Sequence, residues 1–159
     1  MAKKTKQLQT LWWDWLSTAE RLLLSLHEQT AALTLRRVER LEEIQPEIDS
    51  MMAKMTDIDD KAVASAKALA EEFGCEPELR SLLDVLEKAE AQEVQAIANR
   101  VIVVGRNVQE IIDRNKALIE NELEYVNGTI AIVDRAAREQ QGPYLAKAKA
   151  GNLLMDQVA

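Results

Sequence analysis

Few side chains in this sequence could carry out chemistry. His27 is the only histidine and Cys75 the only cysteine among 159 residues. A di-iron site in a helical bundle needs inward glutamates and Glu-x-x-His motifs, but Leu24 stands three positions before His27. We predict that His27, next to Glu28, is a surface or rim residue and that Cys75 is a small buried apolar residue. The sequence alone gives no reason to pair His27 with Cys75 as base and nucleophile.

Motifs for catalysis and for cofactors are missing as well. The sequence contains no Gly-rich phosphate loop, no serine nucleophile elbow and no zinc-ligand spacing. We therefore predict that the protein is not an enzyme and that it uses no metal or cofactor. Finding no metal in the purified protein would dismiss the remaining alternative of a di-metal bundle enzyme. The function that we predict is therefore the binding of another protein.

Composition and charge restrict the fold class, the kind of partner and the cellular compartment that we expect. Apolar residues make up 47% of the chain, charged residues 30%, and there are only 5 glycines and 3 prolines, which predicts an all-α globular fold. The formal net charge of −7 argues against nucleic acid as a partner. Apolar runs such as residues 101–104 are far shorter than the roughly 20 residues that cross a bilayer, so no membrane insertion is expected. A single cysteine and no signal peptide favour the cytoplasm.

Apolar residues at helical spacing predict the elements that position the binding surface. The expected helices span about residues 6–30, 35–58, 62–73 and 78–138. Pro46 should either kink its helix or start a new one, and Gly74 should end the third helix. We expect a single helical domain at 1–142, an antiparallel bundle or coiled-coil hairpin with one very long C-terminal helix. Residues 143–159 are expected to form a flexible, mobile tail.

Two apolar rows run along the predicted C-terminal helix. The first row is Val101, Val104, Val108, Ile111, Asn115, Leu118, Glu122 and Tyr125. The second row is Ile112, Ile119, Leu123, Val126, Ile130 and Val133. Alternating steps of three and four are typical of a coiled-coil seam, and so wide an apolar face predicts contact with more than one helix. The polar Asn115 and Glu122 interrupt the first row. Either they determine the register or the choice of the partner helix, or they lie where the bundle is open.

Two further features could take part in binding. Trp12, Trp13 and Trp15 cannot all face one core, because a helix advances about 100° per residue. We interpret Trp12 and Trp15 as core and Trp13 as a rim residue. The tail has apolar side chains but forms only a marginal helix by itself, so it either becomes ordered on a partner or is an inert terminus.

Several segments, in their order along the chain, give a resemblance to a known family. They are residues 22–24 (Leu-Leu-Leu), 37–41 (Arg-Val-Glu-Arg-Leu), 114–119 (Arg-Asn-Lys-Ala-Leu-Ile), 123–127 (Leu-Glu-Tyr-Val-Asn), 142–144 (Gly-Pro-Tyr) and 153–154 (Leu-Leu). Over nearly its whole length the chain resembles the FlgN family of flagellar export chaperones. That family comprises small acidic helical proteins with an N-terminal hairpin, a long C-terminal helix and a mobile tail.

The resemblance implies a function and a set of partners. The protein would be a cytoplasmic chaperone that binds the C-terminal helical segments of hook-filament junction proteins, prevents premature association and delivers them to the export apparatus. By position, Tyr144 would dock to the flagellar export gate. The client-binding residues that we predict are Asn115, Leu118, Ile119, Leu123, Val126, Ile130, Val133, Leu145, Leu153 and Leu154.

A rival interpretation belongs to a different class of protein. The long helix could self-associate in a structural bundle or coiled-coil adaptor, with Asn115 paired across the interface. The chaperone is expected to be a monomer or a weak homo-oligomer. Light scattering would separate the two, because a stable dimer with a buried seam leaves no groove for a client.

Overall fold

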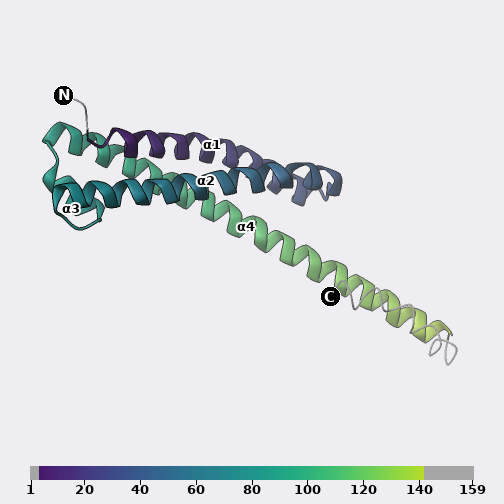
Figure 1. The fold of residues 1–159 in the computed structure, drawn as a ribbon. Coiled ribbons are helices and arrows are strands. Elements are labelled where there is room, and N and C mark those ends of the chain that lie inside the picture. The colour runs from purple at the N-terminus through teal and green to yellow at the C-terminus, as the bar shows by residue number, and fades with distance from the viewer. Residues whose placement is uncertain (1–3, 142–159) are drawn as a thin grey trace. The chain divides into compact units, whose positions relative to one another are not determined.

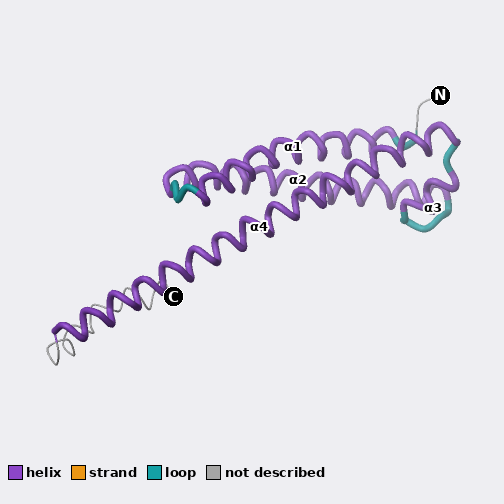
Figure 2. The backbone as a smooth tube through the Cα atoms, turned by 180° about the vertical axis from the view of Figure 1, so that it is seen from behind, coloured by secondary structure: helices purple, strands orange, loops and turns teal. Residues whose placement is uncertain are grey.

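Four helices make up the part of the chain that the structure, a computed structural model, describes, residues 4–141. They are α1 (Lys6–Thr34), α2 (Val38–Phe73), α3 (Leu79–Val85) and α4 (Lys88–Gln141). Figure 1 shows α1 and α2 side by side as a hairpin, and Figure 2 shows only short loops between the helices. Within these residues there is no strand, so the predicted all-α class and the long C-terminal helix are confirmed.

The ends of α1 and α2 have the same backbone arrangement. At the end of α1 the Arg37 N–H donates to the Ala32 carbonyl at 2.9 Å, and Arg36 adopts a left-handed φ of 54°. At the end of α2 the Cys75 N–H donates to the Ala70 carbonyl at 2.9 Å, and Gly74 has a φ of 66°. Such six-to-one hydrogen bonds close a helix and favour glycine at the left-handed position. The prediction that Gly74 ends its helix is confirmed.

Helix α2 is longer than predicted. We expected separate helices at 35–58 and 62–73, but Val38–Phe73 is one helix that continues through Pro46. That expectation was wrong, because Thr56, Asp57, Asp59 and Asp60, which are residue types suited to a helix start, lie inside a continuous helix. Met55, Ile58 and Ala62, which lie beside and between these polar residues, are buried at three- and four-residue spacing, so packing keeps the helix continuous. Pro46 removes one backbone hydrogen bond without ending the helix.

The single helix that we predicted at 78–138 is in fact two. Helix α3 ends at Val85, Leu86 has an extended backbone, and α4 begins at Lys88. No glycine or proline marks this break, so the sequence did not indicate it. Leu82 on α3 is buried in a cluster with residues of α1 and α2, while Glu90 in the first turn of α4 accepts hydrogen bonds from Thr5. Because Leu82 and Glu90 are each held by these contacts, the backbone changes direction between α3 and α4.

The chain divides into two compact units, whereas we predicted one domain at 1–142. Unit 1 is Met1–Asn115 and unit 2 is Lys116–Ala159, so the boundary lies inside α4. In unit 1 α4 runs alongside α1 in the same direction, because Thr5 contacts Glu90 and Leu26 contacts Asn115. The main core cluster joins three helices and consists of Ala19, Leu22, Leu26, Ile44, Ile48, Met55, Val108 and Ile111.

The three tryptophans are arranged on α1 as predicted. Trp12 and Trp15 are partly buried and pack against core clusters, and the Trp15 ring lies 3.6 Å from where a Cβ on Gly105 would sit. Trp13 is 49% exposed, and the Arg100 guanidinium lies 5.7 Å from the centre of its ring. The side chains therefore divide between the core and the rim because consecutive residues point in different directions around a helix.

Candidate partner-binding face

Asn115 on α4 is enclosed within unit 1. Its side chain is 2% exposed, and its Nδ2 donates to the Leu26 carbonyl at 3.0 Å and to Gln29 Oε1 at 2.9 Å. Thr30 Oγ1 donates to Asn115 Oδ1 at 2.6 Å, and Gln29 Nε2 reaches Gln45 on α2 at 3.0 Å. We call these side chains the Asn115 network. Because both ends of the amide are already bonded within the chain, Asn115 differs from the other predicted client residues.

The exposed apolar residues of unit 2 lie on the second of the two predicted rows. Ile119 is 40% exposed, Leu123 50%, Val126 40% and Val133 62%, and Ile130 is partly buried. We call these five residues the α4 stripe. Their steps of four, three, four and three place them on one helical face. Large apolar side chains gathered on one exposed face are typical of a surface that binds another protein.

The two rows have different environments. Val108 and Ile111 of the first row are 7% and 9% exposed in unit 1, where α1 and α2 contribute to their core. Leu118, another predicted client residue, is half-buried in unit 2. The remaining predicted site residues, Leu145, Leu153, Leu154 and the gate residue Tyr144, lie outside the residues that the structure describes, as does the predicted tail at 143–159.

Among the described residues of unit 2, two exposed large apolar side chains were not among the predicted client residues. Ile132 is 70% exposed and Tyr125 is 58% exposed. Tyr125 belongs to the first row, and Ile132 continues the spacing of that row beyond it, so the signal was present in the sequence. On a helical projection these two residues lie about 120–140° from the centre of the α4 stripe, on a separate face.

Acidic residues accompany the α4 stripe. Between residues 117 and 133 the only charged residues are Glu120, Glu122 and Glu124, and no lysine or arginine occurs there. Further along, Asp134 forms an ion pair with Arg138 at 2.9 Å. The first half of the stripe is therefore both apolar and bordered by negative charge.

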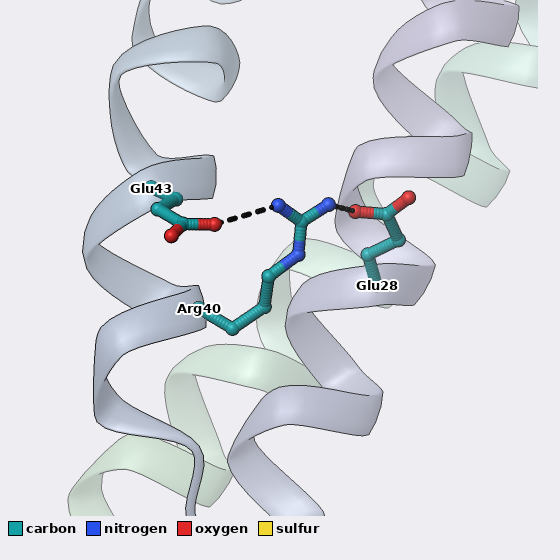
Figure 3. A network of polar contacts seen from close by, with 3 residues as sticks. All are labelled: Glu28, Arg40 and Glu43. Atoms are coloured by element: carbon teal, nitrogen blue, oxygen red, sulfur yellow. Dashed lines mark hydrogen bonds and ion pairs between the residues drawn. The ribbon is translucent and has the colours of Figure 1, made fainter.

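An arginine links the two helices of the hairpin in a segment that carries part of the family resemblance. Arg40 on α2 donates to Glu43 at 2.9 Å and to Glu28 on α1 at 2.5 Å, as Figure 3 shows. The hydrogen bond to Glu43, and after it the one to Glu28, raises the pKa of Arg40 above its ordinary value. Arg40 is therefore charged at every working pH. All three side chains are about half exposed or more, so solvent screens the contact.

The residues that could have carried chemistry have structural positions. His27 is exposed on α1, as predicted, and Cys75 is half-buried against the cluster that contains Leu8 and Leu69. In residues 4–141 no three histidine, cysteine, aspartate or glutamate side chains gather as a metal site would require. Within the same residues no helix is apolar over a length sufficient to span a membrane.

Residues 4–141 form an all-helical structure in which the α4 stripe is a largely exposed apolar helix face. A family comparison places the chain more narrowly. The sequence model of the FlgN family, whose description is FlgN protein, matches residues 1–151 of the chain. The chain therefore belongs to the FlgN family. Neither the comparison with curated proteins nor that with solved structures gave a match. Membership indicates a flagellar export chaperone in general, a protein that binds flagellar export substrates.

Proposed function

We propose that this protein is a cytoplasmic chaperone that binds the C-terminal helical segments of hook-filament junction proteins. It would prevent their premature association and deliver them to the flagellar export apparatus. The observation that carries the proposal is the α4 stripe, a row of large apolar side chains that the described part of unit 2 leaves exposed. Family membership supplies the general class of client.

The geometry of the stripe suits an amphipathic client helix. Side chains at alternating steps of three and four can interdigitate with the same spacing on a second helix. The proposed surface comprises Leu118, Ile119, Leu123, Val126, Ile130 and Val133. Asn115 is left out of the direct contact surface because its amide is buried and bonded within unit 1.

Moderate affinity follows from the same physics. A client segment that becomes helical only on binding loses conformational entropy, which offsets several kcal/mol of the contact energy, on the order of 2–5 kcal/mol. The complex would therefore be strong enough to cover the apolar segment and weak enough to release it at the export machinery. We propose that Tyr144 docks the chaperone to the export gate, a role that rests on the position of this tyrosine in the family resemblance.

Leu123→Asp tests the stripe directly. It places a charge in the middle of the proposed contact, so affinity for a hook-filament junction C-terminal peptide should fall about tenfold or more, since burying a leucine contributes about 1.5–3 kcal/mol. Isothermal titration with the full chain measures the change. Leu24→Asp is the matched control, because Leu24 is 69% exposed on α1 and the variant adds the same charge. Equal losses in both variants, or no binding by the unaltered protein, would overturn the proposal.

Deleting residues 144–159 tests the tail separately. We expect lower affinity for the same peptide, because Leu145, Leu153 and Leu154 are proposed to extend the apolar surface. The same titration measures the difference between the full and the shortened chain. Unchanged affinity would remove the tail from the client surface and leave the α4 stripe as the whole of it.

A further inference from the structure

The positions that border the α4 stripe restrict which helix can lie on it. If Ile119, Val126 and Val133 occupy d positions of a heptad and Leu123 and Ile130 occupy a positions, the e and g positions follow. They are Glu120, Glu122, Asn127, Thr129, Asp134 and Ala136. Three of the six are acidic and none is basic.

We propose that the α4 stripe selects a helix that carries lysine or arginine at the positions flanking its own apolar row. In helix pairs, residues at e and g face those of the partner and decide which partner is accepted. Asp134 is paired with Arg138 at 2.9 Å, so Glu120 is the flanking acid at which we test the preference for positive charge. This inference rests on the proposed client surface and adds the charge pattern of the client.

A second copy of this chain does not meet the requirement. In a parallel pair the e positions of one helix face the g positions of the other, and in an antiparallel pair e faces e and g faces g. In either orientation the flanking residues of a second α4 bring acids and neutral side chains but no lysine or arginine. Like charges at such positions destabilise a pair. A foreign helix with basic flanks is therefore the better complement.

Two designed peptides provide the test. Each would be a helix of about four heptads with identical apolar residues at a and d, and the two would differ only in having lysine or glutamate at every e and g position. Fluorescence anisotropy with the full chain at low salt should show the lysine peptide binding about tenfold more tightly. The preference should shrink at about 0.5 M salt, where the screening length is only a few ångströms.

A pair of charge variants separates local pairing from general attraction to an acidic protein. Glu120→Lys and Glu139→Lys change the net charge equally, but Glu139 lies on the face of α4 opposite the stripe. The lysine peptide should lose about threefold in affinity with Glu120→Lys and remain unchanged with Glu139→Lys. Equal effects of the two variants would overturn the inference.

The remaining outcomes are also decisive. Equal binding of the two peptides, tighter binding of the glutamate peptide, or no binding of either would overturn the charge preference. So would a stable dimer in light scattering that Leu123→Asp dissociates, because a second copy would then occupy the stripe. Failure of the junction-protein peptide to bind, with the lysine peptide still binding, would overturn the proposed function and leave the charge preference standing.

Discussion

Leu22→Ala should lower the free energy of unfolding of unit 1 by about 3 kcal/mol or more. Leu22 is fully buried at 0% exposure in the core cluster shared by α1, α2 and α4. Truncation removes the transfer free energy of the lost methyl groups and leaves a cavity that three helices can close only partly. Urea unfolding followed by tryptophan fluorescence measures the loss in unit 1, because all three tryptophans are on α1.

Leu24→Ala is the matched control for this substitution. It makes the same chemical change two positions further along α1, where the side chain is 69% exposed. The free energy of unfolding should then change by no more than about 0.5 kcal/mol. Similar losses in the two variants would contradict the packing of α1 described above, since Leu22 would not then be in a shared core.

Asn115→Ala should lower the free energy of unfolding of unit 1 by about 2–3 kcal/mol. The substitution removes the donor that reaches the Leu26 carbonyl and Gln29 Oε1, and it removes the acceptor for Thr30 Oγ1. Thr30 Oγ1 can still donate to the Leu26 carbonyl at 3.0 Å, but Gln29 Oε1 belongs to a buried side chain and loses its donor. A buried polar atom without a partner loses its hydration without compensation. The same fluorescence-detected urea unfolding measures the effect.

Asn107→Ala provides the comparison on the same helix. Asn107 is exposed on α4 within unit 1, so its loss should leave the free energy of unfolding within about 0.5 kcal/mol of the unaltered protein. If Asn115→Ala were equally harmless, the Asn115 network would contribute nothing to stability. The rival adaptor interpretation, in which Asn115 pairs across a dimer, would then regain a reason to be considered.

The periodicity of apolar residues was enough to predict the helical class, the long C-terminal helix and several local details. Gly74 ends α2 because its backbone is left-handed, a conformation that glycine adopts without the steric cost of a Cβ. This preference can be predicted from the identity of that one residue. Trp12 and Trp15 turn toward the core and Trp13 toward the rim because the angular advance of a helix is constant. These predictions depend only on local backbone geometry.

Helix boundaries were less predictable where distant contacts outweighed local signals. Thr56, Asp57, Asp59 and Asp60 are suited to starting a helix, but the burial of Met55, Ile58 and Ala62 keeps α2 continuous. Conversely, residues 86–87 contain no helix breaker, yet the anchors at Leu82 and Glu90 separate α3 from α4. Helix propensities differ between residues by a few tenths of a kcal/mol to about 1 kcal/mol, which is less than the free energy of burying one large side chain. Burial therefore decides these helix boundaries.

The sequence by itself determined that α4 would carry two apolar rows, because side-chain spacing along a helix is a property of the chain. Only the tertiary structure decided that Val108, Ile111 and Asn115 of the first row are enclosed in unit 1 while the α4 stripe is exposed in unit 2. The physical reason is that burial requires a neighbouring surface. In unit 1 that surface is supplied by α1 and α2, and the spacing of residues along α4 does not contain that information.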